Sequence, residues 1–183
     1  MAVQTASDTH VWWSELKHGG VLISPAVLAE QFPSVAQPDS YSYFRLRDRY
    51  NSFSSWWSKQ TNLNQGDAAQ LHAWLDAVLD EFLGHSRSMW LKGTDVPPSL
   101  AIDSAFRERL KPSRVLYRGS DKKQPAMLVL VDRVARLGQG RGRSGYSKLL
   151  ELLRATGTKL GLLTNGMQFR LCYAGLDYDA WTE

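Results

Sequence analysis

The sequence predicts an α/β fold, and three of its patterns support this prediction. Apolar side chains recur at helical spacing through residues 67–83, which is typical of an amphipathic helix. A nearly continuous apolar run at 126–134 is typical of a strand buried on both faces. The pair Asn165-Gly166, between two strand-like segments, indicates a β-hairpin.

These patterns divide the chain into two portions. Residues 1–106 read as an α-helical N-terminal portion, whereas residues 107–183 combine strands with a helix. Together they have the length of one ordinary domain. The abrupt end at Trp181-Thr182-Glu183 leads us to expect a piece of a longer protein.

Capping signals mark the first expected helices. Ser24 is a good N-cap, and Pro25 suits the first turn of a short helix that ends before Pro33. Residues 41–60 predict a second helix, because aromatic side chains recur there at roughly helical spacing.

The clearest helix is expected over residues 67–83. Asp67 can cap its start, and Gly84 can end it. Asp76 lies off the apolar stripe and is expected to face water. We expect the stripe to pack against the sheet or the earlier helices; it consists of Leu71, Trp74, Leu75, Val78, Leu79 and Phe82.

The C-terminal portion is expected to run strand, strand, basic glycine-rich loop, helix and hairpin. Residues 164–167 would form a tight type I′ turn, in which both central residues have positive φ. Residues 85–112 read as irregular, apart from a short helix at 104–110. The expected strands are 115–118, 126–134, 159–164 and 167–173, the loop is 138–145, and the helix is 146–155.

The charge of the chain is distributed unevenly. Residues 1–106 hold 7 Lys/Arg and 11 Asp/Glu, whereas residues 107–170 hold 15 Lys/Arg and 4 Asp/Glu. The last 13 residues hold 3 acids and no bases. A segment as basic as 107–170 attracts polyanions such as DNA or RNA, although a well-solvated surface is the plainer alternative.

Several classes of protein lose support from the composition. No apolar run approaches the length of a membrane span, the N-terminus lacks the apolar stretch of a signal peptide, and Cys172 is the only cysteine. We therefore expect a cytoplasmic protein without disulfides or a cysteine-rich zinc site. The histidines are not spaced for a metal site either.

The segment Gly140-Arg-Gly-Arg-Ser-Gly145 matches a dinucleotide fingerprint in its glycine spacing. The acid expected at the end of the next strand is missing, because Thr164 and Asn165 stand there. Two arginines crowd the loop, and guanidinium forks bind phosphate oxygens in pairs. We therefore favour a basic loop near a nucleic-acid backbone over a nicotinamide or flavin site.

Two tryptophan pairs allow two interpretations. Trp12-Trp13 and Trp56-Trp57 are suited to stacking on nucleobases. Packing in a core or an interface is the interpretation that we prefer.

The segment 159–173, KLGLLTNGMQFRLCY, resembles a recurrent segment of nuclease-like N-terminal domains. Such domains form the N-terminal part of type I restriction subunits and of large type IIG-like adenine methyltransferases, including those of phage-defence systems such as DISARM. Trp12-Trp13, Gly19-Gly20 and residues 22–33 look like the opening of such methyltransferases. The tail, residues 176–183, resembles the stretch leading into their next domain.

The resemblance implies a PD-(D/E)xK-like core with an eroded metal site. In that arrangement two acids hold a divalent cation and a lysine orients the attacking water. Ser113 or Arg114 stands where the first Asp is expected, and Val131-Asp132-Arg133 stands where the acid-x-Lys is expected. With Asp132 as the acid, a valine replaces the lysine; with Arg133 as the base, a valine replaces the acid.

These observations predict a DNA-contacting, catalytically degenerate module of a DNA methyltransferase in restriction-modification or antiviral defence. Its partners would be DNA, a downstream methyltransferase domain and possible other defence-system subunits. S-adenosylmethionine would belong to the parent protein, and no cofactor is expected in this piece. The residues expected to form one basic surface against DNA phosphates are Lys122, Lys123, Arg133, Arg141, Arg143 and Lys148.

Two alternatives remain at this point. An active Mg²⁺-dependent endonuclease would use Asp132 for the metal, with Asp103 or Glu81 brought close by packing. A protein-docking or regulatory module would instead present surface aromatics to another subunit; those considered are Trp56, Trp57 and Trp90.

Overall fold

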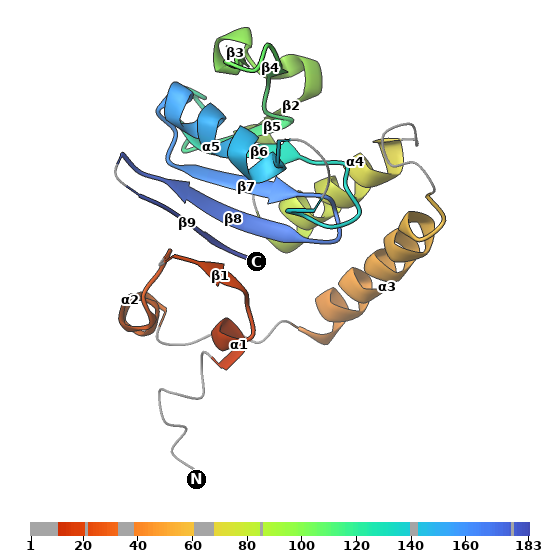
Figure 1. Ribbon diagram of the computed structural model, residues 1–183. Helices are drawn as coiled ribbons and strands as arrows, with labels where there is room; N and C mark the ends of the chain where they lie inside the picture. The colour runs from red at the N-terminus through yellow and green to blue at the C-terminus, as the bar shows by residue number, and fades with distance from the viewer. Residues whose placement is uncertain are drawn as a thin grey trace.

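A seven-stranded, mostly antiparallel sheet with helices on both faces organises the computed structural model of the chain (Figure 1). The structure describes residues 11–20, 22–32, 39–60, 68–84, 86–139, 143–176 and 178–183. The described α-helices are α1 (Val11–Ser14), α2 (Pro25–Gln31), α3 (Ser40–Trp57), α4 (Ala68–Asp76) and α5 (Gly145–Thr156). The mixed α/β class is thereby confirmed.

The sheet is ordered β1-β9-β8-β7-β6-β5-β2. Strands β6 and β7 are parallel and are connected through α5, whereas every other neighbouring pair is antiparallel. A separate hairpin joins β3 and β4. The strands are β1 (His18–Gly19), β2 (Trp90–Lys92), β3 (Ile102–Asp103), β4 (Arg109–Leu110), β5 (Arg114–Tyr117), β6 (Pro125–Val131), β7 (Leu160–Thr164), β8 (Phe169–Ala174) and β9 (Asp179–Thr182).

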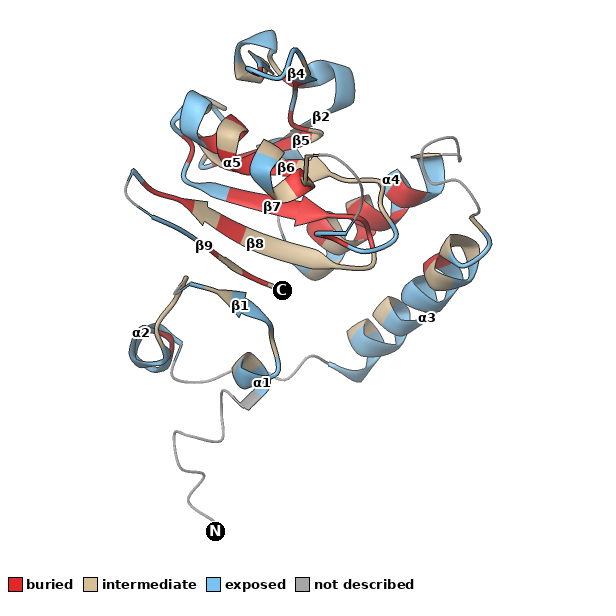
Figure 2. Cartoon of the chain, viewed as in Figure 1, coloured by how far each residue is buried: buried red, intermediate tan, exposed pale blue. Residues whose placement is uncertain are grey.

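Helix α5 covers one face of the sheet, and its limits agree with the expected helix at 146–155. Ser144 caps its start by accepting a hydrogen bond from the Ser147 backbone N–H, and Gly157 ends it in the left-handed region at φ 70°. Its leucines pack on inward-facing residues of the central strands, such as Leu128 and Leu163. Buried residues therefore concentrate around β6, β7 and α5 (Figure 2).

Helix α4, continued by the π-helical turn η2 (Ala77–Phe82), covers the opposite face. Most of the expected apolar stripe is buried there: Leu75 and Leu79 are fully enclosed, and Trp74 packs on Phe53 of α3, whereas Val78 and Phe82 are half-buried. The stripe thus lies against both the sheet and α3, as predicted. The wider turn η2 was not expected, and Gly84 follows it with φ 68°.

The other predicted helices have mixed outcomes. Helix α2 is capped by Ser24, whose Oγ accepts from the Val27 backbone N–H at 3.2 Å, as predicted. Helix α3 also agrees with prediction, and Asp39 caps it. The short helix expected at 104–110 is wrong, because strands β3 and β4 pair there across a turn in which Arg107 has φ 59°. Asp67 lies outside the described residues.

The β7–β8 hairpin is confirmed, but its expected type I′ turn is wrong. Thr164 pairs with Phe169, so that four residues connect the strands, and Asn165 does not have positive φ. The Asn165 side chain replaces a tight backbone turn: its Oδ1 accepts from the backbone N–H of Met167 at 3.0 Å and of Gln168 at 2.8 Å. Asn165 is fully buried, and its Nδ2 donates to the carbonyl of Val134 at 3.0 Å.

Three sheet strands were not expected from the sequence, and they join the two expected portions. Strands β1 and β2 come from residues 1–106 and form the two edges of a sheet whose centre comes from 107–183. Strand β9 pairs between β8 and β1. None of the helices in the described ranges has both the length and the apolar character that crossing a bilayer requires.

Short 3-10 turns complete the described segment that precedes β5. They are η3 (Arg87–Met89), η4 (Gly93–Asp95) and η5 (Pro98–Leu100).

We expect Trp74→Ala to lower the free energy of unfolding by about 3–5 kcal/mol. Trp74 is only 7 % exposed, and its indole N–H donates to the Gly166 carbonyl at 2.7 Å. The substitution removes this packing and leaves that carbonyl unsatisfied. Urea denaturation measures the loss, and Tyr41→Ala, at a 70 % exposed position of α3, is the control with little expected effect. An equal loss in both variants would contradict the burial of Trp74.

Candidate nucleic-acid interface

The basic residues predicted to form one surface lie at two ends of the sheet. Lys122 and Lys123 occupy the β5–β6 turn, which precedes β6, whereas Arg133 and Arg143 follow its last residue, Val131. A strand of this length separates its two ends by roughly 20 Å. The described residues of the predicted surface therefore fall into two groups, one at each end of β6. Arg141 lies outside the described residues.

Two of the predicted DNA-binding cations are engaged with acids of their own chain. Arg143 pairs with Glu151, donates to Ser104 Oγ at 2.7 Å, and stacks over the Phe106 ring at 4.6 Å. Lys148 pairs with Glu108 at 2.7 Å. Both cations attach the β3–β4 hairpin to α5, so that a phosphate would compete with internal partners for them.

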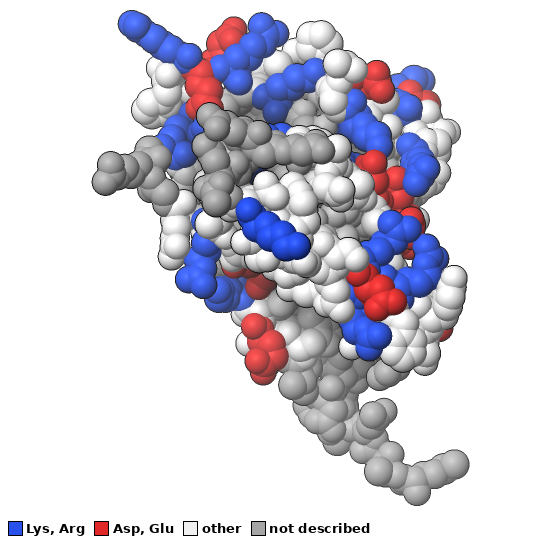
Figure 3. Space-filling view, turned by 90° about the vertical axis from the view of Figure 1, so that its right-hand side faces the viewer, with Lys and Arg blue, Asp and Glu red and all other residues white. Residues whose placement is uncertain are grey.

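The surface charges on the α3–α4 side are mixed rather than uniformly basic. Figure 3 shows several separate groups of Lys and Arg on this face, with acidic side chains between them along one side. Part of this mixing comes from Glu81, which binds Arg45 at 2.7 Å and Arg49 at 3.1 Å. Net charge alone therefore does not identify a binding site on this face. The contacts of each Lys and Arg show which of them can bind a phosphate.

A group of cations gathers where β2 ends and β5 begins. Arg114 is buried, with 3 % of its side chain exposed, and it pairs with Asp76 of α4. Lys92 pairs with the other oxygen of Asp76 at 2.7 Å, and Lys111 donates to the Gly93 carbonyl at 3.1 Å. We call four residues around this ion pair the edge cluster: His72, Lys92, Lys111 and Arg133.

Electrostatic coupling connects His72 with Arg114, Arg133 and Lys92. Burial lowers the pKa of His72, and the positive charges of Arg114 and Arg133 lower it further. The pKa of Asp76 is also lowered: burial would raise it, but the hydrogen bonds and charges of Lys92 and Arg114 outweigh burial. Asp76 therefore stays ionised as the counter-ion of Arg114, and His72 is held neutral near pH 7.

The strand register shows which side chains share the face of the sheet that α4 covers. Arg114 pairs with Val129, and Val129 and Val131 both point to the face covered by α4. These two valines are the side chains that share a face with Arg114 and Asp76. Asp132, next along the chain, lies on the other side of the sheet, against Gly145 at the start of α5.

Asp132 has a structural environment at the start of α5. A Cβ atom added to Gly145 would lie 2.3 Å from Asp132 Oδ2, so that only glycine fits against this carboxylate. Burial raises the pKa of Asp132, and the nearby Lys148 charge and the Gly145 N–H oppose that rise. The glycine of the fingerprint-like loop thus makes room for an acid of this chain.

The acids proposed to assist Asp132 are not brought to it. Asp103 is exposed in the β3–β4 hairpin, and Glu81 is bound to α3 arginines. Within the ranges that the structure describes, no three His, Cys, Asp or Glu side chains are grouped as metal ligands. The described residues therefore offer no assembled divalent-cation site.

The predicted aromatic pairs differ in their surroundings. Trp56 and Trp57 pack on Phe53 in the core beneath α3, which agrees with the packing interpretation. Trp90, considered as a surface aromatic, is instead buried against the sheet. Trp12, by contrast, is exposed.

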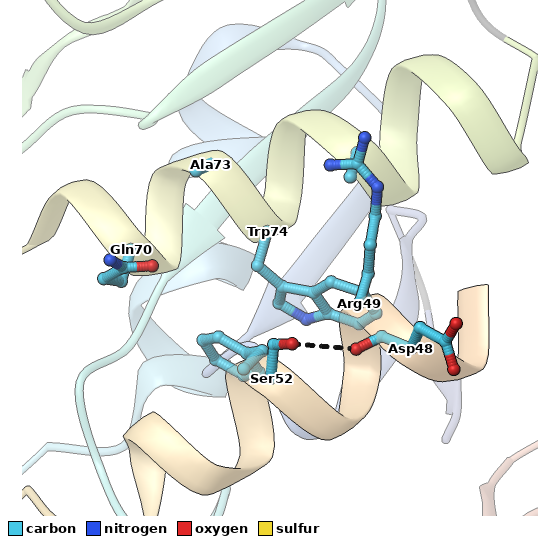
Figure 4. A pocket seen from close by; sticks show the side chains of 8 residues that line it. Asp48, Arg49, Ser52, Gln70, Ala73 and Trp74 are labelled. Atoms are coloured by element: carbon cyan, nitrogen blue, oxygen red, sulfur yellow. Dashed lines mark hydrogen bonds between the residues drawn. The ribbon is translucent and has the colours of Figure 1, made fainter. Parts of the chain in front are cut away.

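A hollow of about 300 Å³ lies between α3 and α4 (Figure 4). Trp74 extends from α4 towards α3 and forms one wall, while Asp48, Arg49 and Gln70 lie at its margin. Ser52 closes one side and donates to the Asp48 carbonyl at 3.0 Å. A second, mostly aromatic hollow lies on the other side of Trp74, towards β8.

Sequence reasoning missed the edge cluster, although one signal was present. Arg114 interrupts an otherwise apolar strand, and alternation places it on the same face as Leu116, beneath α4. A buried arginine requires a carboxylate partner. Asp76, expected to face water, supplies that partner.

No protein-family model matches the chain, and no curated protein or solved structure matches it either.

We expect Asp76→Asn to destabilise the fold by about 3 kcal/mol at pH 7, because it leaves the Arg114 guanidinium buried without its counter-ion. The folded-state pKa of Asp76 lies below its ordinary value of 3.8, so that its contribution is present above pH 3.8 and lost as pH falls through the lower folded-state value. Urea unfolding of wild type and variant should therefore differ at pH 7 and converge in acid. Asp48→Asn, at an exposed position, is the control.

Proposed function

We propose that the chain is a DNA-contacting, catalytically degenerate nuclease-like module of a DNA methyltransferase in restriction-modification or antiviral defence. The order of hairpin β5–β6, helix α5 and hairpin β7–β8 supports a PD-(D/E)xK-like core. One observation carries the functional part: a buried Arg114–Asp76 pair and two valines occupy the catalytic face, while exposed cations surround it.

The replacement of a metal site by a cation explains the loss of chemistry. A divalent cation needs oxygen ligands, and Val129 and Val131 supply none. The Arg114 guanidinium already neutralises Asp76, the α4 carboxylate on the same face. Such a site retains positive charge for a phosphate but no group to bind a metal or to orient a water molecule.

The edge cluster supports phosphate binding in this proposal. Lys111 is exposed and Arg133 is half-buried, whereas Lys92, although exposed, is paired with Asp76. Lysine and arginine contacts to phosphates supply affinity that is largely independent of sequence. The downstream methyltransferase domain would then provide base recognition and S-adenosylmethionine binding.

We predict that Lys111→Ala/Arg133→Ala weakens duplex DNA binding for all sequences alike. It should flatten the slope of log K against log salt by about 1.8, because each released phosphate contact contributes about 0.9. Titration at several salt concentrations measures this slope. The matched control is Lys122→Ala/Lys123→Ala, which removes the same charge from the opposite end of the sheet. Equal changes of the salt slope in both double variants would mean that DNA affinity depends on net charge and not on the edge cluster.

We also predict that the chain does not cleave DNA with Mg²⁺ or Mn²⁺. The reason is that Val129 and Val131 offer no metal ligand and that Asp76, on the same face, is already bound by Arg114 and Lys92. A plasmid-nicking assay measures the activity, with Asp132→Ala run in parallel. Metal-dependent cleavage that disappears in Asp132→Ala would instead establish the endonuclease alternative.

A further inference from the structure

The aromatic hollow beside α3 is built from one stripe of that helix. Tyr43, Leu46, Arg47 and Tyr50 recur at i, i+3, i+4 and i+7, and all four line it. Its floor comes from other elements: Trp74 and Val78 from the α4 stripe, and Phe169 from β8. The hollow encloses about 390 Å³, within the range of about 300–1,000 Å³ that is usual for small-molecule sites.

The two tyrosine rings of the stripe are largely uncovered. Tyr43 is 53 % exposed and Tyr50 is 41 % exposed, although both face a hollow with an aromatic floor. Seven residues of helix separate them by about 10.5 Å along the axis. Both rings are therefore accessible from the mouth of the hollow.

The charge at the rim is positive. Arg47 lines the hollow with half of its side chain exposed, and its guanidinium stacks over Phe44 at 4.9 Å. Helix α3 holds three arginines and one aspartate. Glu81 engages Arg45 and Arg49, whereas Arg47 lines the hollow and lies 3.5 Å from the exposed carboxylate of Asp48.

We propose that this hollow binds an unpaired nucleobase of single-stranded DNA, stacked on the tyrosine rings, with Arg47 at the adjoining phosphate. This rests on the proposed function, because it assumes that the chain engages DNA. Aromatic stacking combined with an arginine is the usual means of holding single strands. Positive charge at the rim favours a nucleic acid over an apolar protein helix.

The floor makes such binding tolerant of base identity. The Trp74 indole N–H is already used by the Gly166 carbonyl at 2.7 Å, so that the floor presents ring faces rather than a free donor. Stacking on ring faces accepts any base, because every base has a π-face. We therefore expect little preference among oligonucleotide sequences.

The hollow and the edge cluster lie on opposite flanks of α4. His72 and Asp76 face β5, while Trp74 and Val78 face α3. The helix between them is about 10 Å wide. A DNA molecule held by its phosphates at the edge cluster can thus place an unpaired base in the hollow.

The test measures binding of a fluorescently labelled oligothymidylate and of a labelled duplex by anisotropy, using the full chain. Tyr43→Ala and Tyr50→Ala should each lower the affinity for oligothymidylate by about 5- to 150-fold, which is the range for one lost base stack. Neither variant should change the affinity for the duplex. Tyr43→Phe and Tyr50→Phe keep the rings and should bind as wild type. Tyr41→Ala, outside the hollow, is the matched control.

Three outcomes would overturn the inference. They are unchanged oligothymidylate affinity in both alanine variants, an equal loss for duplex and single strand, and a loss in the phenylalanine variants as large as in the alanine ones. Urea unfolding of each variant shows whether it is folded. Tyr50 contacts Trp74, with ring centroids 6.2 Å apart, so that Tyr50→Ala can disturb the core. If Tyr50→Ala is unfolded, the binding measured with Tyr43→Ala tests the inference.

The same measurements separate this inference from the proposed function. In one outcome, Lys111→Ala/Arg133→Ala flattens the salt slope for duplex DNA while the tyrosine variants bind oligothymidylate normally. This result would contradict base binding in the hollow and support phosphate binding by the edge cluster. In the other outcome, the edge-cluster variant leaves duplex binding unchanged while the tyrosine variants bind oligothymidylate more weakly. This result would contradict phosphate binding by the edge cluster and support base binding in the hollow.

Discussion

The ion pair between Arg114 and Asp76 is the interaction on which the arrangement of α4 and the sheet depends. A guanidinium with 3 % of its side chain exposed cannot remain without a counter-ion, because a buried unpaired charge costs several kcal/mol. Asp76 has to come from the last turn of α4, which sets how far the helix lies along β5. Arg114 also donates to the His72 carbonyl at 3.1 Å, so that a second point of α4 is attached to the same strand.

A second buried polar group connects elements at the same end of the sheet as Arg114. Asn165, fully buried after β7, orders its own loop through Oδ1 and reaches the segment after β6 through Nδ2. The Gly166 carbonyl that this loop exposes receives the Trp74 indole N–H. An added Cβ at Gly166 would lie 2.5 Å from Leu71 and 2.6 Å from Phe53, which explains glycine there. The hairpin loop is therefore part of the core beneath α3 and α4.

These constraints shape what the proposed function requires of the chain. The face of the sheet beneath α4 holds Arg114, Val129 and Val131, none of which offers an oxygen ligand to a divalent cation. Nucleic-acid affinity needs exposed cations, and the edge cluster supplies them around a pair that is already neutralised. Arg143 and Lys148, which are basic in the sequence, are used to attach the β3–β4 hairpin to α5 instead.

The sequence alone determined the elements whose signals are local. Helix α5 with its Ser144 and Gly157 ends, the α4 stripe and the buried strand β6 all follow from spacing and capping, which depend on neighbouring residues. Only the tertiary structure decided that Asn165 is a buried side-chain partner, that the edge strands β1 and β2 complete the sheet, and which cations are free. Two-residue and three-residue edge strands hold too few residues to show a period. The partners of Arg114, Arg143 and Lys148 lie 38, 8 and 40 residues away, so that their pairing is fixed by folding rather than by local sequence.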